Sequence, residues 1–284
     1  MEIEKVGILG AGVMGAGIAQ ISLEAGYTVE LIDAAPDVVD KAVKLLNKQW
    51  FKAVDKGKRT TADITVFASM LSTGTDISRL KDCDIVIEAI IENIEIKKNV
   101  HKQLGGICKP ETILATNTSA LSITEIAAAT NRPSQVVGMH FFNPATVMKL
   151  VEVIPGAETT EQVVATAVAM SRRIGKDPVV TREVPGFIVN RILIPYINEA
   201  AQVYQEGIAS AEEIDKAMKL GANMPMGPLA LADLVGIDIV LAICEYFWKE
   251  FGDSKYRASL AFRQKVRAGH LGMKTGKGFY EYSK

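Results

Sequence analysis

Lys5-Val6-Gly7-Ile8-Leu9-Gly10-Ala11-Gly12-Val13-Met14-Gly15 is the stretch that decides the fold of this chain. Its apolar first part, Lys5 to Leu9, predicts a strand, and Met14 to Ala25 predicts a helix that Gly26 ends. The three glycines between them have the spacing of a dinucleotide-binding turn. The first makes the tight turn, the second lets a pyrophosphate approach the backbone, and the third lets the helix pack on the strand. The start of the helix then offers N–H donors to phosphate.

An acidic residue after the next strand extends this motif. Thr28 to Ile32 predicts the strand, and Asp33 follows it, eighteen residues after Gly15. A carboxylate there accepts hydrogen bonds from the adenosine ribose and repels a 2′-phosphate, so we expect NAD rather than NADP. The same residues also fit a glycine-rich turn of an unrelated α/β protein, in which Asp33 would cap a helix or a turn. The residues predicted to contact NAD here are Gly10, Ala11, Gly12, Val13, Met14, Gly15 and Asp33.

The rest of the chain predicts two domains, as a length of 284 residues suggests at roughly 150 residues per domain. Apolar runs such as Asp84 to Ile90 and Thr112 to Thr116 lack alternation, which is typical of a parallel sheet covered on both faces. From Phe187 onward the pattern is helical, with one helix expected from Leu229 to about Phe251. We predict an α/β fold, with a doubly wound Rossmann-type domain over residues 1–185 and an all-helical domain over residues 186–284.

The composition is that of an ordinary soluble globular protein, with 48% hydrophobic and 23% charged residues. The net charge of −1 gives no reason to expect binding to nucleic acid or to a membrane surface. No apolar run reaches the ~18 residues of a membrane span, and the first strand begins too early for a signal peptide. Cys83, Cys108 and Cys244 lack the spacing of metal ligands, so we expect buried, reduced thiols, no metal, and a cytoplasmic location.

A histidine and a glutamate interrupt two later apolar runs. Val136 to Phe141 and Lys149 to Ile154 predict strands, which contain His140 and Glu152. If these strands pair antiparallel about a loop centred on Thr146, the two residues face each other with Cβ atoms roughly 5 Å apart. The carboxylate would then fix one ring nitrogen and leave the other to move a proton, which suits oxidation of an alcohol. A structural core histidine beside a strand-edge glutamate fits the spacing nearly as well.

Separated motifs, taken in order, resemble those of the L-3-hydroxyacyl-CoA dehydrogenases. They are Gly10–Gly15, Glu88–Asn93, Ala115–Ser119, His140–Pro144, Pro185–Arg191 and Lys274–Tyr280. In length and motif set the chain is most similar to the bacterial members that act on 3-hydroxybutyryl-CoA. The resemblance implies NAD-dependent oxidation of (S)-3-hydroxybutyryl-CoA, or another short-chain 3-hydroxyacyl-CoA, to acetoacetyl-CoA or the matching 3-oxoacyl-CoA, and the reverse reduction. Such a reaction belongs to fatty acid and butanoate metabolism.

The same resemblance implies a role for each matching residue. His140 would be the catalytic base and Glu152 its partner, while Ser119 and Asn190 would hold the reacting oxygen of the substrate. The residues implied to line the cofactor site are Glu92, Lys97, Asn117, Ser119, Asn143 and Lys274. Without the resemblance, Asn117, Ser119 and Asn190 also fit as ordinary capping residues. The role of Glu88, which interrupts a buried strand, stays open.

A small basic cluster is the expected binding site for the phosphates of coenzyme A. Lys52 and Lys56 are one helical turn apart at the end of a helix predicted from Pro36, and Lys58 and Arg59 follow. Cations at a helix C-terminus also complement the helix dipole. The resemblance favours contact with the acyl-CoA substrate, Lys56 above all, and implies a homodimer formed through the helical domain.

Two other functions stay open for a chain of this kind. A free-hydroxyacid dehydrogenase would use a catalytic lysine, and the His–Glu pair together with the basic cluster argues against it. An NAD(P)H-binding structural protein is the other, since a lens crystallin is similar to this family. The sequence determines neither the preferred acyl chain length nor the physiological direction.

Overall fold

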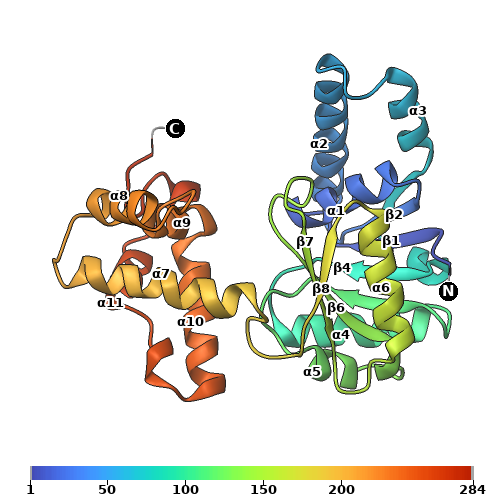
Figure 1. Cartoon of the computed structure of the whole chain (residues 1–284). Helices are drawn as coiled ribbons and strands as arrows, with labels where there is room; N and C mark the ends of the chain where they lie inside the picture. The colour runs from blue at the N-terminus through green and yellow to red at the C-terminus, as the bar shows by residue number, and fades with distance from the viewer. Residues whose placement is uncertain (1, 283–284) are drawn as a thin grey trace. The chain divides into compact units, whose positions relative to one another are not determined.

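The computed structural model describes residues 2–282, and the chain divides into two compact units, Met1–Phe187 and Ile188–Lys284 (Figure 1). Within the described residues the first unit contains one sheet of eight strands. In order across the sheet they are β3 (Leu71–Gly74), β2 (Thr28–Ile32), β1 (Lys5–Leu9), β4 (Ile85–Glu88), β5 (Ile113–Thr116), β6 (Val136–Phe141), β7 (Leu150–Pro155) and β8 (Asp177–Val180). Neighbouring strands run parallel, except that β6 and β7 are antiparallel.

Helices cover both faces of this sheet. On one face Ile8 and Val29 pack in a core with α1 (Val13–Glu24), α2 (Pro36–Asp55) and α6 (Glu161–Arg173). On the other face Leu9 and Val86 pack with η1 (Ile77–Asp82), α4 (Ile94–Ile107) and α5 (Ile123–Ala128). The interior strands are buried on both sides, which explains why their sequences do not alternate. The predicted doubly wound α/β arrangement is confirmed.

The second unit is built from helices, as predicted. They are α7 (Val189–Gln205), α8 (Ala211–Gly221), α9 (Pro228–Val235), α10 (Ile237–Phe251), the short η3 (Ser254–Tyr256), α11 (Leu260–Arg267) and the short η4 (Met273–Thr275). The prediction of one helix from Leu229 to Phe251 is wrong. Gly236 separates α9 from α10 at a φ of 104°, a conformation that glycine adopts at little cost.

Two buried carboxylates organise the hydrogen bonds of this helical unit. Asp215 on α8 accepts hydrogen bonds from the first backbone N–H groups of α9, at Leu229 and Ala230. Asp233 on α9 accepts from the backbone N–H groups of Phe279 and Tyr280, at 2.9 Å each, and from the Tyr282 hydroxyl at 3.0 Å. Each carboxylate therefore joins segments that are distant in the sequence.

The three cysteines are free and buried, as predicted. Burial raises the pKa of the Cys83 and Cys244 thiols to about 12 and that of Cys108 to about 11, so all three stay protonated at neutral pH. Among the helices of residues 2–282, none combines the length and the apolar character that a membrane crossing requires.

Candidate active site

The glycine turn has the three properties that its spacing predicts. Gly10 has a φ of 105°, and a Cβ atom there would lie 2.5 Å from the carbonyl oxygen of Ala89. A Cβ atom on Gly15 would lie 1.7 Å from the Gly10 carbonyl oxygen, so only glycine lets α1 pack this closely. At Gly12, no atom from elsewhere in the described structure lies within 4 Å of the position that a Cβ would take. The backbone at Gly12 is thus open to a ligand.

A cavity of about 880 Å³ lies against this turn. Its size falls within the range of small-molecule and cofactor sites. Helix α1 begins at its edge with no acidic residue in the first turn and no side chain capping its N–H groups, so those donors suit a phosphate. Of the predicted NAD contacts, the cavity lining includes Gly10, Gly12, Val13, Met14 and Asp33. Ala11 and Gly15 are buried behind the turn.

Asp33 both lines the cavity and acts as a cap. Its Oδ2 accepts a hydrogen bond of 2.8 Å from the Ala11 N–H, and its Oδ1 accepts one of 3.0 Å from the Ala35 N–H. The carboxylate therefore holds the glycine turn against the end of β2. A carboxylate oxygen has two lone pairs, so each oxygen retains capacity for a hydroxyl donor of a ligand.

His140 and Glu152 lie directly opposite each other in the register of β6 and β7. The symmetry about Thr146 predicted this pairing. His140 Nδ1 is 2.7 Å from Glu152 Oε2, and the two residues are 4% and 0% exposed. The imidazole also packs against the rings of Phe142 and Phe187, with centroids 4.4 and 5.7 Å away. With Nδ1 bound to Glu152, Nε2 is the ring nitrogen suited to exchange a proton with a substrate.

Asn143 lies in the loop after β6, where it is exposed and precedes a cis peptide bond to Pro144. The buried Lys176 holds this loop, because its Nζ donates hydrogen bonds to the carbonyl oxygens of Ala145 and Met148. Burial lowers the pKa of Lys176. The predicted cofactor residue Asn143 therefore lies in a loop that hydrogen bonds attach to the start of β8.

A second set of predicted residues meets at the ends of β4 and β5. Glu92 Oε1 accepts hydrogen bonds from the Thr118 hydroxyl at 2.5 Å and the Ser119 N–H at 2.8 Å. Glu92 Oε2 is 3.4 Å from the ammonium of Lys97, which comes from α4. Asn117 Oδ1 accepts a 2.9 Å hydrogen bond from the Phe141 N–H, next to His140. Asn117, Ser119, Glu92 and Lys97 are thus brought together beside β6.

The role that the sequence left open for Glu88 becomes visible here. Glu88 Oε1 lies 2.6 Å from Lys97 Nζ, and Glu88 Oε2 lies 3.5 Å from Nε2 of His101. Burial alone raises the pKa of Glu88, but the imidazole of His101 and the charge of Lys97 outweigh it and hold that pKa below its ordinary value. Sequence reasoning missed His101. The available signal was its position one helical turn after Lys97, on a helix beside a strand that contains a glutamate.

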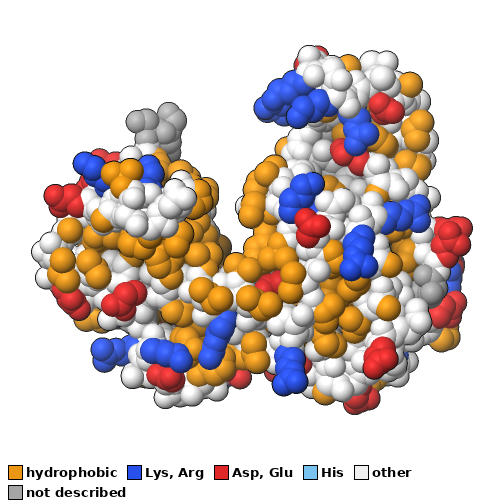
Figure 2. All heavy atoms as spheres, in the orientation of Figure 1, with side chains coloured by type: hydrophobic (Ala, Val, Ile, Leu, Met, Phe, Trp, Pro, Cys, Tyr) orange, Lys and Arg blue, Asp and Glu red, His pale blue; other side chains and the backbone are white. Residues whose placement is uncertain are grey.

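Figure 2 shows Lys and Arg side chains gathered over the end of α2 where the basic cluster was predicted. Lys52, Lys56 and Lys58 are exposed there. Arg59 is different, because its guanidinium forms a 2.9 Å ion pair with Glu24 of α1 and lies over the ring of Phe67. Arg59 therefore fastens the turn after α2 to α1, and the lysines are the cations available to a ligand.

The last two predicted site residues belong to the second unit. Asn190 is half-buried in the first turn of α7. Lys274 Nζ lies 2.6 Å from Asp238 at the start of α10.

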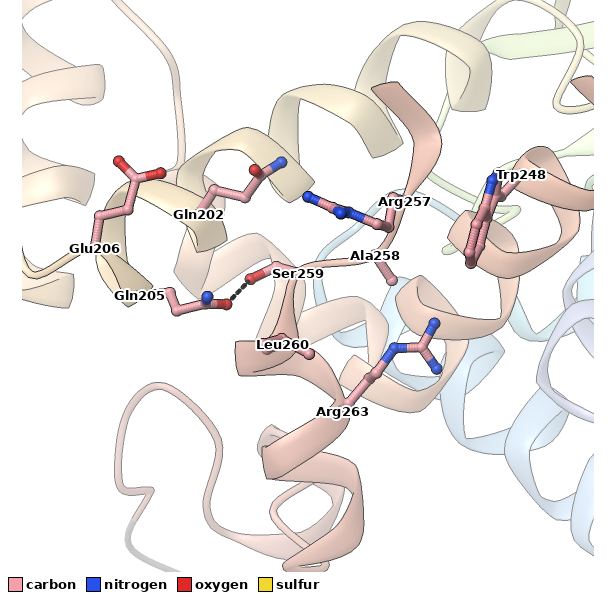
Figure 3. Close-up of a pocket in the computed structure, with 9 residues that line it drawn as sticks. All are labelled: Gln202, Gln205, Glu206, Trp248, Arg257, Ala258, Ser259, Leu260 and Arg263. Atoms are coloured by element: carbon pink, nitrogen blue, oxygen red, sulfur yellow. Dashed lines mark hydrogen bonds between the residues drawn. The ribbon is translucent and has the colours of Figure 1, made fainter. Parts of the chain in front are cut away.

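The helical unit also contains a cavity of about 350 Å³, which none of the predicted residues lines. Figure 3 shows its lining, which comes from the C-terminal part of α7, from Trp248 of α10 and from the segment between Arg257 and Arg263. The Ser259 hydroxyl donates a 2.9 Å hydrogen bond to Gln205 Oε1 there.

Comparison with known proteins identifies the family. The NAD-binding domain model of 3-hydroxyacyl-CoA dehydrogenase matches residues 5–184, and the C-terminal domain model matches residues 186–282. The chain is 52% identical to a 3-hydroxybutyryl-CoA dehydrogenase of Clostridioides difficile, over 99% of this chain and 100% of that protein. A probable 3-hydroxybutyryl-CoA dehydrogenase of Bacillus subtilis is 48% identical over 99% and 98% of the two chains. The crystal structure of (S)-3-hydroxybutyryl-CoA dehydrogenase PaaH1 from Ralstonia eutropha covers 100% of both chains at 47% identity and a TM-score of 0.96. This chain belongs to the 3-hydroxyacyl-CoA dehydrogenase family.

Proposed function

We propose that this protein uses NAD to oxidise (S)-3-hydroxybutyryl-CoA to acetoacetyl-CoA, and that it catalyses the reverse reduction. The observation that carries the proposal is the buried contact between His140 and Glu152, in the same sheet whose first turn borders a cavity suited to a dinucleotide. The names of the similar proteins support the choice of a four-carbon acyl group.

His140 is the proposed acid–base group. In the oxidation its Nε2 takes the proton of the substrate 3-hydroxyl, and the carboxylate of Glu152 stabilises the imidazolium that results. In the reduction the imidazolium returns this proton to the oxygen. The buried carboxylate also fixes the tautomer of the neutral ring, with the proton on Nδ1 and a free lone pair on Nε2.

The residues around the glycine turn fit NAD. Gly12 leaves space for a pyrophosphate, the uncapped start of α1 offers N–H donors, and Asp33 retains lone pairs for the ribose hydroxyls. When bound, NAD supplies the acceptor for the hydride that leaves C3 of the substrate. We assign Glu92, Lys97, Asn117, Ser119, Asn143 and Lys274 to the cofactor site as well.

The remaining assignments concern the substrate and the assembly. Ser119 and Asn190 are proposed to hold the reacting oxygen, and Lys52 and Lys56 to bind phosphates of coenzyme A. The exposure of both lysines supports the latter role. We also propose a cytoplasmic homodimer that forms through the helical unit.

The deciding experiment follows the loss of NADH absorbance when the purified protein is mixed with acetoacetyl-CoA. We expect oxidation of NADH with this thioester and none with free acetoacetate. A series of 3-oxoacyl-CoAs from four to ten carbons then measures the chain-length preference. A folded protein that binds NADH but oxidises it with none of these thioesters would be a nucleotide-binding protein rather than this dehydrogenase. Sedimentation at the monomer mass of 30.7 kDa at micromolar concentration would contradict the dimer.

A further inference from the structure

The first unit contains ionisable groups that lie out of contact with solvent behind the nucleotide cavity. Glu88 and His101 are 0% exposed, and Lys97 is 1% exposed. Burying charges costs free energy, and a well-packed apolar replacement of a buried ion pair is often as stable or more stable. The stability of the fold therefore gives no sufficient reason for a charged cluster at this position. The contacts of these buried groups with the surrounding backbone supply another reason for their presence.

The Glu88 carboxylate joins three pieces of backbone that end near the cavity. Its Oε1 accepts a 2.8 Å hydrogen bond from the N–H of Ile90, in the loop after β4 that lines the cavity. The same oxygen receives the ammonium of Lys97 from α4 at 2.6 Å. Its Oε2 accepts a 2.8 Å hydrogen bond from the hydroxyl of Thr116, the last residue of β5. One side chain thus sets the relative positions of two strand ends and a helix.

The contacts continue from Lys97 toward the predicted site. The ammonium of Lys97 lies between two carboxylates, with Glu88 at 2.6 Å and Glu92 at 3.4 Å. Glu92, whose side chain is 41% exposed, in turn receives the N–H of Ser119. A continuous series of contacts therefore leads from the buried Glu88 to the edge of the site. It passes through Lys97 and Glu92 to Ser119.

We propose that Glu88 is a positioning residue for NAD binding, because its carboxylate holds the Lys97 ammonium against Glu92 and so fixes the loop that carries Ser119. This inference rests on the proposed function, which assigns Lys97 and Glu92 to the cofactor site. Glu88 itself acts through Lys97 and does not touch the cofactor. Replacing the Glu88 carboxylate with a neutral amide of the same shape leaves Glu92, at 3.4 Å, as the one carboxylate within ion-pair distance of the Lys97 ammonium among the described residues.

The experiment is a double-mutant cycle on the full-length protein, read as the Kd for NADH by fluorescence. The variants are Glu88→Gln, Lys97→Met, and the two together. We expect each single change to raise the Kd about tenfold, within the range for contacting residues, and the double variant to bind no more weakly than Lys97→Met alone. The Kd for NADH is the readout because the same loop carries Ser119, which is proposed to hold the reacting oxygen of the substrate, so a KM for acetoacetyl-CoA would combine both roles.

Thr112→Val is the matched control. It removes a buried 2.7 Å hydrogen bond to the Cys83 carbonyl oxygen, just before β5 and at the end opposite Thr116. We expect this control to unfold at a lower temperature with an unchanged Kd for NADH. A loss of packing alone would therefore move the melting temperature and leave NADH binding as it was.

Three results would overturn the proposal. The first is a Kd for NADH in Glu88→Gln that equals the wild-type value. The second is a fold-increase in Kd of the double variant that equals the product of the two single fold-increases. The third is failure of both Glu88→Gln and the charge-retaining Glu88→Asp to fold. Because NADH binding is measured without turnover, the outcome is separate from that of the activity assay. A wild-type protein without activity toward acetoacetyl-CoA, but with coupled Glu88 and Lys97, would contradict the proposed reaction and leave this inference intact.

Discussion

Glu152 approaches His140 from the strand directly opposite, with 2.7 Å between Oε2 and Nδ1, and both belong to one antiparallel pair of strands. The two residues are only twelve positions apart in the sequence. The register of β6 and β7 places them opposite each other, and neither residue lines the cavity beside the glycine turn. The first two predictions use this separation.

Replacing His140 with Gln should lower kcat by roughly 10² to 10⁴-fold, since the amide has a similar size but no titratable proton to exchange. Binding of NADH, measured by fluorescence, should stay within about twofold of wild type. Turnover at the wild-type rate would show that another group moves the proton.

Replacing Glu152 with Gln should also lower kcat, by about 10²-fold or more, for a different reason. The amide nitrogen can donate to Nδ1 and so favours the tautomer in which Nε2 carries the proton, which is the wrong form for a base. Rates measured with both substrates, alongside circular dichroism to verify folding, test this. An active Glu152→Gln enzyme would mean that the carboxylate only supports the fold.

Asp33 should make the enzyme prefer NAD over NADP, because its carboxylate lines the cavity and repels a 2′-phosphate. Asp33→Ser should lower kcat/KM with NAD by about tenfold, which corresponds to about 1.4 kcal/mol, and affect the value with NADP less. Steady-state rates at equal concentrations of the two cofactors give the comparison. Equal turnover of wild-type protein with NAD and NADP would refute this role.

Lys56→Ala should raise the KM for acetoacetyl-CoA several-fold with little change in kcat, because an exposed ammonium contributes binding energy far from the reacting bond. Salt should weaken the effect, since exposed charges are screened. Lys102→Ala, which removes an exposed lysine on α4, is the control of equal charge. An unchanged KM in Lys56→Ala would remove this residue from the coenzyme A site.

Glu88 should make part of the stability depend on pH. Burial alone would raise the pKa of Glu88, but the His101 imidazole and the Lys97 ammonium outweigh it and hold that pKa below the ordinary value of 4.5, so between the two values the unfolded chain binds more protons than the folded one. The stabilisation is therefore fully present above pH 4.5 and declines as the pH falls below it. Urea unfolding of wild type and Glu88→Gln from pH 7 to pH 3 should show the gap in unfolding free energy narrowing over the acidic part of this range. A gap that stays constant would contradict the prediction.

The parts of the site that follow from local pattern were predictable from the sequence. Strand side chains alternate with a period of two, so the equal spacing of His140 and Glu152 about Thr146 was enough to place them opposite each other. The glycine turn was predictable for a similar reason, since its roles depend on backbone geometry over a few residues.

The parts that depend on distant contacts were not predictable. The pairing of Arg59 with Glu24 spans 35 residues, and nothing near Arg59 in the sequence distinguishes it from the free lysines before it. Similarly, α3 (Thr61–Ser69) and β3 were not anticipated, although Thr60 and Asp63 form a capping box at the start of α3. Both α3 and β3 are short and about half exposed, so the apolar pattern of their sequences is weak. The break between α9 and α10 at Gly236 was not predicted, because a helix often tolerates a single glycine inside an apolar helical pattern.

The hydrogen bonds of Asp233 also bear on the order of events during synthesis of the chain. The donors to its carboxylate lie 46 to 49 residues later, at Phe279, Tyr280 and Tyr282. A carboxylate buried without these donors would be costly. The helical unit therefore cannot reach its final packing until residue 282 has left the ribosome, whereas all the strands of the first sheet have been made by Val180. Residues up to Phe187 thus have time to fold while the later helices still lack their last partners.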